Sequence, residues 1–239
     1  MVQLQAKPER TKTDKRIPVT VVTGFLGSGK TTLINKILQG QKERKVAVIV
    51  NEFGEIGIDG QLVIEDGDEQ LVEFNNGCLC CTVRDDLVKT LTKLTERADL
   101  DSILIETTGL ADPAPVASTF FVSEELRPSL KLDAFVTLVD AYNFDRNLKG
   151  SHEAEEQIAF ADILLLNKTD LVEPEALEAL EKQLKSLNPL AKIYHAEYSD
   201  VDLSRVIDVG AFELDAKLEV DPEFLDDLEH EHDAAVGSF

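Results

Sequence analysis

The sequence predicts an α/β fold in which a mostly parallel β-sheet is flanked by helices. Two observations lead to this prediction: short apolar runs rich in β-branched residues recur along the chain, and segments with helical periodicity separate them. Continuous apolar runs indicate strands buried on both faces, which is the arrangement found in parallel sheets. The runs comprise residues 19–22, 46–50, 103–105, 135–139, 163–166 and 193–194.

The apolar spacing also places two helices between these runs. Leucines recur at helical spacing after Pro174, and Asn188-Pro189 ends the pattern. A second helix is predicted to begin near Thr82, which has the spacing of a capping box with Asp85. Alternation of strands and helices in this manner predicts a sheet covered on both sides.

The length of 239 residues, with 43% hydrophobic residues, suffices for one main domain with an appendage. Residues 1–16 are polar and without apolar periodicity, which predicts a disordered leader, and residues 17–208 hold the predicted strands and helices. Within residues 209–239, the segment 212–233 carries ten carboxylates against Lys217 alone. This composition predicts a solvated acidic linker, and the alternative is an arm that collects cations.

The formal net charge of −22 argues against two classes of partner. A polyanion is repelled by nucleic acid and by anionic lipid surfaces, so we expect neither as a partner. The sequence has no apolar run of the roughly 20 residues that a bilayer span needs, nor the apolar centre of a signal peptide. The three cysteines are too close together for unstrained disulfides, and we therefore expect a reducing cytoplasmic location.

The segment after the first predicted strand, residues 24–31, matches the phosphate-binding pattern G-x-x-x-x-G-K-[ST] and opens a predicted helix. This pattern predicts that the chain is a P-loop NTPase. Glycines allow backbone N–H groups to curl around phosphates, the lysine supplies a positive charge to the β and γ oxygens, and the first threonine holds Mg²⁺. The candidate residues are Gly24, Gly27, Ser28, Gly29, Lys30, Thr31 and Thr32.

Glu106 ends the predicted strand at residues 103–105 and can hold a magnesium-bound water, while Gly109 lies where the γ-phosphate is sensed. No glutamine follows Gly109 to orient an attacking water, so we predict slow intrinsic hydrolysis. Water positioning is assigned instead to a carboxylate in the loop of residues 51–59, which occupies the place of a switch. Glu52 is the candidate there, and Lys30 and Glu106 complete the candidate catalytic set.

Asn167-Lys168-Thr169-Asp170 ends another buried run with the pattern N-K-x-D. The Asp170 carboxylate can accept hydrogen bonds from the N1 and N2 donors of guanine, Asn167 can bond the other edge of the base, and the Lys168 stem can cover its face. Adenine lacks this pair of donors. The pattern therefore predicts that the nucleotide is GTP.

All three cysteines, Cys78, Cys80 and Cys81, lie in one C-x-C-C cluster. Thiolates at this spacing can bind one soft ion, with zinc favoured and cobalt or copper(I) as alternatives. The helix predicted after them would lower their pKa values through its positive N-terminal end. Three sulfurs leave one tetrahedral position for another ligand, and redox chemistry or simple burial are the competing interpretations.

Taken in order, the sequences G-F-L-G-S-G-K-T, N-E-F-G, N-N-G-C-L-C-C, E-T-T-G-L-A-D-P and N-K-T-D closely resemble the metal-handling P-loop GTPases of the CobW type. The resemblance implies a SIMIBI-class G domain with low GTPase activity. It implies GTP, Mg²⁺ and Zn²⁺ as ligands, with Cys78, Cys80 and Cys81 as zinc ligands. It further implies a metallochaperone that transfers zinc to a client metalloprotein under GTP/GDP control, and a nucleotide-dependent homodimer is one option for its assembly.

Several alternatives stay open at this point. The ion can be cobalt or iron delivered to cobalamin synthesis or nitrile hydratase, or the protein can be a metal store or sensor without productive turnover. Relatives of the CobW type usually continue into a second α/β domain, and residues 232–239 look like its first strand. We therefore expect this chain to be a G domain with a truncated C-terminal domain.

Overall fold

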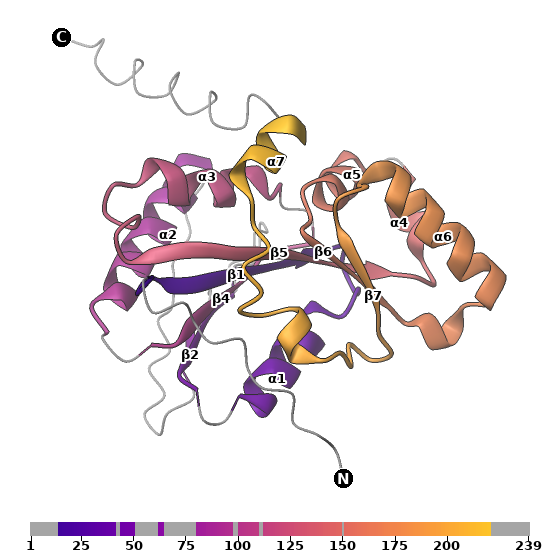
Figure 1. Ribbon diagram of the computed structural model, residues 1–239, viewed down its shortest axis with the longest axis horizontal. Coiled ribbons are helices and arrows are strands. Elements are labelled where there is room, and N and C mark those ends of the chain that lie inside the picture. Colours follow the sequence, from indigo (N-terminus) through magenta and orange to yellow (C-terminus); the bar gives the residue numbers. More distant parts are fainter. Residues whose placement is uncertain are drawn as a thin grey trace.

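The computed structural model describes residues 14–41, 44–50, 62–64, 80–97, 100–109, 112–149 and 151–220. These residues form a β-sheet with helices packed on both of its faces (Figure 1). The strands are β1 (Ile17–Gly24), β2 (Val46–Val50), β3 (Leu62–Ile64), β4 (Ser102–Glu106), β5 (Leu130–Asp140), β6 (Ile163–Asn167) and β7 (Lys192–His195).

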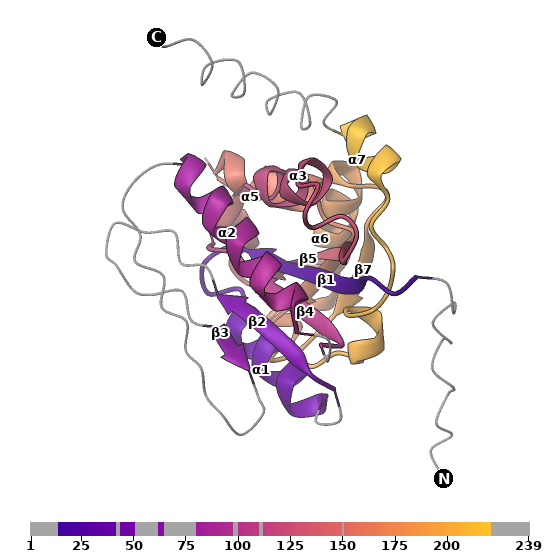
Figure 2. The ribbon, with the colours of Figure 1, turned by 90° about the vertical axis from the view of Figure 1, so that its left-hand side faces the viewer.

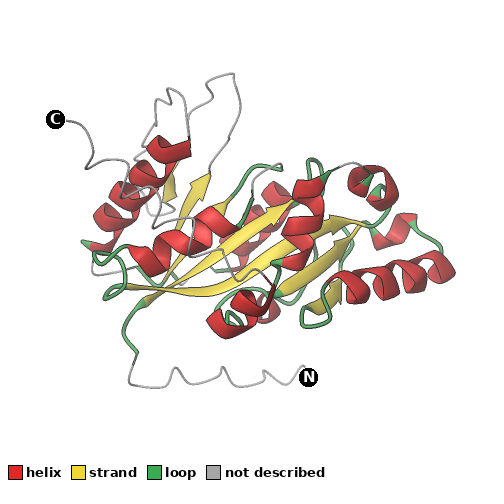
Figure 3. Cartoon of the chain, turned by 90° about the horizontal axis from the view of Figure 1, so that it is seen from above, coloured by secondary structure: helices red, strands yellow, loops and turns green. Residues whose placement is uncertain are grey.

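The helices connect these strands and lie on either side of them, as Figure 3 shows from above. They are α1 (Lys30–Gly40), α2 (Cys80–Thr95), α3 (Ala114–Val122), α4 (Phe144–Leu148), α5 (His152–Ala159), α6 (Pro174–Leu187) and α7 (Leu214–Val220). Two 3-10 turns, η1 (Thr169–Leu171) and η2 (Leu203–Arg205), follow β6 and β7.

The strand order in the described part of the sheet is β3-β2-β4-β1-β5-β6-β7. Every neighbouring pair is parallel except β2 and β3, which are antiparallel. The predicted mostly parallel α/β sheet is therefore confirmed, and all six predicted apolar runs lie in strands. The helix predicted after Pro174 is also present, as α6.

The helix predicted to begin near Thr82 is present as α2, which begins two residues earlier, at Cys80. A capping box requires its first residue to stand outside the helix, whereas Thr82 lies within the first turn of α2. Nothing in Cys80-Cys81-Thr82 excludes helical backbone angles, so the helix extends to include the last two cysteines of the cluster.

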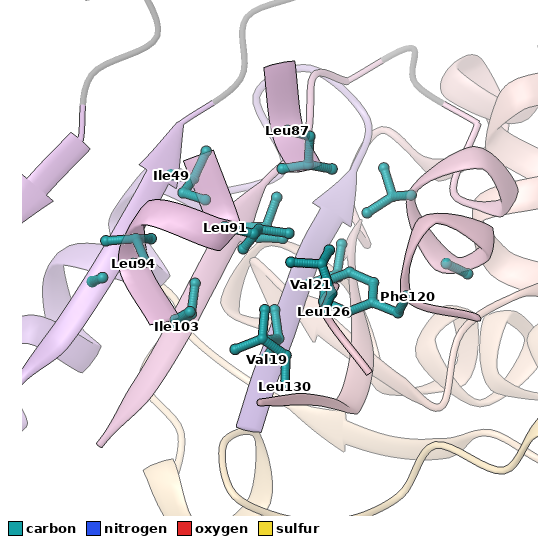
Figure 4. Close-up of a cluster of buried hydrophobic side chains, with 14 of the residues drawn as sticks. Val19, Val21, Ile49, Leu87, Leu91, Leu94, Ile103, Phe120, Leu126 and Leu130 are labelled. Carbon is teal, nitrogen blue, oxygen red and sulfur yellow. The ribbon is translucent and has the colours of Figure 1, made fainter. Parts of the chain in front are cut away.

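Two apolar layers hold the sheet between its helices. Figure 2 shows α1 on the opposite side of the sheet from α2 and α3. On the α2 side, Leu87 and Leu91 pack over Val21 and Ile103, and Phe120 of α3 completes the cluster (Figure 4). Residues pointing to the other face of the strands pack against α1. Alternate residues of β1 and β4 face opposite layers, and both layers are buried. These strands therefore form continuous apolar runs in the sequence.

The C-terminal part of the described chain folds back onto the sheet. Asp133 of β5 is buried and accepts hydrogen bonds from Thr20 Oγ1 at 2.8 Å and from the backbone of Gly210 at 2.7 Å. Phe212 then stacks on Phe121 of α3, with ring centroids 5.6 Å apart, and Lys217 of α7 is buried. The interpretation of residues 212–233 as a solvated linker is therefore wrong for Phe212 and Lys217.

Candidate nucleotide site

The predicted nucleotide residues meet at the edge of the sheet formed by the carboxyl ends of the strands. Glu106, the last residue of β4, pairs in register with Val22 of β1, just before the glycine-rich loop. On the other side of β1, Asp140 ends β5 beside Asn167, which ends β6. The chain leaves β1 toward β2 on one side and later continues to β5 on the other. Ligands of open α/β sheets bind beside such a reversal, which here lies at the end of β1.

The loop between β1 and α1 requires glycine at two positions that the pattern predicted. Gly24 has φ +131°, and a Cβ there would lie 2.3 Å from the carbonyl oxygen of Leu138. Gly29 has φ +111°, and its Cβ would lie 2.4 Å from Asn167 Nδ2. Both positions combine a left-handed backbone with close approach of another chain segment, which only glycine accommodates.

Lys30 lies inside this loop and is 9% exposed. Its ammonium donates hydrogen bonds to the carbonyl oxygens of Gly24 at 2.8 Å and Phe25 at 3.3 Å. Burial lowers the pKa of Lys30, and the negative charge of Glu106 acts in the opposite direction. The loop therefore holds its cation close to its own backbone, opposite a carboxylate.

Thr31 and Glu106 bring two oxygen ligands together beside the loop. The Thr31 hydroxyl donates to Glu106 Oε1 at 3.0 Å, and Glu106 is only 7% exposed. Hydroxyl and carboxylate oxygens are the donors that Mg²⁺ prefers, so the pair fits the predicted role of Thr31. Thr32 follows on the first turn of α1 and is exposed.

Four buried hydroxyl groups around the loop have no hydrogen-bond partner within the described residues. They share a position at the carboxyl edge of the sheet and belong to Thr23, Ser28, Thr107 and Thr108. Buried polar groups in native proteins are nearly always paired with protein, water or ligand. Their concentration here indicates that this edge is built to face a polar ligand.

Asn167 makes contacts that the sequence did not predict. Its Nδ2 donates to the carbonyl oxygen of Ser28 at 2.8 Å and to Ser199 Oγ at 3.1 Å, and its Oδ1 accepts from the Ser199 backbone at 2.7 Å. The Ser199 hydroxyl in turn donates to the Gly29 carbonyl at 3.0 Å. The buried amide of Asn167 thus fastens the phosphate-binding loop to the segment after β7.

Lys168 has a left-handed backbone with φ 63°, and its ammonium lies 2.6 Å from Asp140 Oδ2. Asp140 also accepts hydrogen bonds from the backbone and side chain of Asn143. Burial of Asp140 raises the pKa of its carboxyl, but the hydrogen bonds from Lys168 and Asn143 outweigh this effect and leave that pKa below its ordinary value. The ion pair fixes the lysine stem next to the exposed Asp170 in η1.

Gly109 contacts two other segments of the chain. A Cβ on Gly109 would lie 2.6 Å from the backbone nitrogen of Leu26, so the segment after β4 touches the phosphate-binding loop directly. Gln157 Nε2 of α5 also donates to the Gly109 carbonyl oxygen at 3.3 Å. Gly109 therefore contacts both the loop and α5.

Other predicted residues lie outside the part of the chain that the structure describes. These are Glu52 and Cys78, and for Cys80 and Cys81 only the backbone, on the first turn of α2, is described. Within the described ranges no group of three or more His, Cys, Asp or Glu side chains is arranged to hold a metal ion. The predicted zinc ligands thus stay a prediction.

Sequence reasoning missed three residues of this site: Asp140, Gln157 and Ser199. Asp140 could have been found by the rule that singled out Glu106, because it too is a carboxylate ending a buried strand. Ser199 and Gln157 carry no motif, and their contacts with residues 32 and 48 positions away are visible only in the fold.

The family model described as the CobW/HypB/UreG nucleotide-binding domain matches residues 18–195. The chain belongs to this family. The match spans the strands, the glycine-rich loop and the N-K-x-D segment described above, and the resemblance expected from the sequence is confirmed.

Individual relatives agree with this assignment. The chain is 42% identical over 204 residues to the zinc-regulated GTPase metalloprotein activator 1 of Schizosaccharomyces pombe, covering 82% of this chain and 50% of that protein. It is 41% identical over 204 residues to the zinc chaperone YjiA of Escherichia coli, covering 83% of this chain and 63% of that protein. The chain thus spans between half and two thirds of the length of these relatives.

A solved structure shares the fold. The crystal structure of the Zn(II)-bound YjiA GTPase from Escherichia coli aligns with a TM-score of 0.65 and 35% sequence identity, covering 83% of this chain and 63% of that one. Within the described residues, no helix has both the length and the apolar character needed to cross a membrane.

Proposed function

We propose that this chain binds GTP with Mg²⁺, hydrolyses it slowly, and uses the nucleotide state to control a zinc ion that it passes to a client metalloprotein. The observation that carries the proposal is the meeting of the phosphate-binding loop, Glu106 and the N-K-x-D segment at one edge of the sheet. Relatives named as zinc-regulated GTPase and zinc chaperone support both the GTPase activity and the metal.

The phosphate end of the site suits a nucleoside triphosphate. Lys30 and the backbone N–H groups of the loop would neutralise and bond the phosphate oxygens. Thr31 and Glu106 would hold Mg²⁺, which supplies positive charge to the β- and γ-phosphates when bound. Gly109, in contact with the loop at Leu26, would respond to the third phosphate.

The base end of the site suits guanine. Asp170 is exposed in η1 and is free to accept from two donors on one edge of a base. The ion pair with Asp140 holds Lys168 with its stem available to cover the face of the ring. Xanthine carries an acceptor where guanine carries the N2 donor, so Asp170→Asn should move the base preference from GTP toward XTP.

The zinc end of the proposal rests on Cys78, Cys80 and Cys81 and on the start of α2. A helix N-terminus favours the thiolate form that binds zinc. The connection to the nucleotide would run through residues 51–59 with Glu52, because this loop leaves β2 at Val50, which pairs in register with Glu106. We also propose that residues 17–208 form the GTPase unit and that it works in the cytoplasm, where thiols stay reduced.

Zinc titration with a competing chelator tests the proposal, in the presence of either GDP or a non-hydrolysable GTP analogue. The dissociation constant for zinc should differ between the two nucleotides, and the Cys78→Ser, Cys80→Ser, Cys81→Ser variant should lose the tight zinc site. Lys30→Ala should keep zinc binding and lose its dependence on nucleotide. Equal zinc affinities in both nucleotide states of the unmodified protein would overturn the proposal.

A further inference from the structure

Gln157 is a buried amide of α5 that neither the sequence patterns nor the proposed site accounts for. It is 1% exposed, and the backbone of α5 is fixed at this point because Thr137 Oγ1 of β5 donates to the Gln157 carbonyl oxygen at 2.8 Å. From this fixed position its Nε2 reaches the carbonyl oxygen of Gly109 at 3.3 Å. Residues 109 and 157 are thus joined across the interior of the protein.

The contact matters because Gly109 also touches the phosphate-binding loop. The Gly109 backbone lies against Leu26 of the phosphate-binding loop so closely that no side chain fits between them. Gly109 has no side chain through which it could be anchored, so its backbone position depends on its neighbours. The Gln157 amide supplies a second contact to this backbone, at the Gly109 carbonyl oxygen.

We propose that Gln157 is a positioning residue that fixes Gly109 against the phosphate-binding loop and thereby sets how strongly the chain prefers GTP over GDP. The inference rests on the proposed function. Its physical basis is that only the third phosphate requires Gly109 in a defined place, whereas the α- and β-phosphates are held by the loop itself. Loss of the Gln157 hydrogen bond therefore weakens GTP binding selectively.

The test compares Gln157→Met with the unmodified protein by nucleotide titration in the presence of Mg²⁺. Methionine keeps the length and volume of the side chain and removes the donor. The dissociation constant of a non-hydrolysable GTP analogue should rise roughly fivefold to tenfold, as expected for one lost hydrogen bond, while that of GDP changes less than about twofold.

Asn188→Ala is the matched control, because Asn188 supports the same helix without approaching Gly109. Its Nδ2 donates to the carbonyl oxygens of Ile158, Ala159 and Ala161 at the end of α5. This variant should lower the thermal stability and leave the ratio of the two dissociation constants unchanged. If Asn188→Ala also lowered the ratio of the GDP dissociation constant to that of the GTP analogue, general loosening of α5 would explain the lost preference for GTP. That result would overturn the inference.

Gln157→Glu provides a second variant if the methionine variant does not fold. Its carboxylate repels the Gly109 carbonyl when ionised and can donate a hydrogen bond when protonated, so the preference for GTP should recover as the pH falls through the pKa of the introduced group. Equal effects on GTP and GDP, or none on either, would overturn the inference while leaving the proposed function intact. An unmodified protein that binds neither nucleotide would refute both.

Discussion

Lys217 and Asp162 form an ion pair inside the protein, with Nζ 2.5 Å from Oδ1. The lysine also donates to the Phe160 carbonyl oxygen at 2.6 Å, and Asp162 accepts from the Phe135 backbone at 2.7 Å. Burial lowers the pKa of Lys217 and raises that of Asp162, and each charge opposes the shift of the other. The pair attaches α7 to the middle of β5 and to the segment between α5 and β6.

Lys217→Met should destabilise the protein by roughly 3–5 kcal/mol at neutral pH, because it leaves the Asp162 carboxylate buried without a counter-charge. The double variant Lys217→Met, Asp162→Asn should recover much of this loss, since no uncompensated charge remains. Urea unfolding of the single and double variants measures both effects. Equal losses in the two variants would show that the charge is not the source.

Ser199→Ala should loosen the phosphate-binding loop. It removes the hydrogen bond to the Gly29 carbonyl and the acceptor for Asn167 Nδ2, and the expected cost is about 1–2 kcal/mol of unfolding free energy. Ser204→Ala, whose hydroxyl bonds the exposed Asp202, is the control and should cost less than about 0.5 kcal/mol. Urea unfolding distinguishes the two, and similar costs would contradict the role given to Ser199.

Gly29→Ala should destabilise the protein more than Gly27→Ala. Both glycines have positive φ, but an added Cβ on Gly29 meets Asn167 and Ser199, whereas one on Gly27 meets open space. We expect backbone strain of about 1 kcal/mol at Gly27 and at least roughly 2 kcal/mol more at Gly29, from steric overlap. Thermal unfolding of the two variants measures the difference, and equal melting temperatures would refute the described packing.

Asp140→Asn should reduce stability in a pH-dependent manner. The pKa of Asp140 in the folded protein lies below the unfolded value near 3.8. The carboxyl therefore binds a proton more weakly in the folded state than in the unfolded state, and its charged form stabilises the folded protein at higher pH. This contribution is complete above the unfolded pKa and is lost as the pH falls through the lowered folded pKa. The variant should therefore be less stable than the unmodified protein by roughly 1–2 kcal/mol at neutral pH.

Urea unfolding over a pH series provides the measurement. The difference between the two proteins should shrink once the pH falls below about 4, where the unfolded Asp140 begins to take up its proton. A difference that stayed constant into the acid range would show that Asp140 carries no such linkage.

Local patterns sufficed to predict the strands β1, β2, β4, β5, β6 and β7, and to predict that the glycine-rich loop and the N-K-x-D segment follow strands. β1, β4 and β6 are buried on both faces, so apolar runs marked them directly, and the loop glycines are demanded by backbone geometry within a few residues. In the sequence, Glu106 and Asn167 each end an apolar run. Parallel pairing of the strands brings these ends to the same edge of the sheet.

Contacts between distant segments escaped the sequence analysis. Lys217 looked solvated because its neighbours are acidic, and only the fold brings it to Asp162, 55 positions earlier in the chain. The use of Asn167 as a support for the loop, rather than solely as a ligand for a base, depends likewise on Ser199 arriving from beyond β7. Such partners have no periodicity or spacing that a linear pattern could detect.

The attachment of Asn167 to Ser28 has a consequence for altering nucleotide selectivity. Under the proposed function the Asn167 side chain would contact the base while its amide supports the phosphate-binding loop, so a substitution there should change base recognition and phosphate binding together. Asp170 is exposed on its 3-10 turn, and no such contact with the phosphate-binding loop is described for it. We therefore expect substitutions at Asp170 to change the base preference with less effect on phosphate binding than substitutions at Asn167.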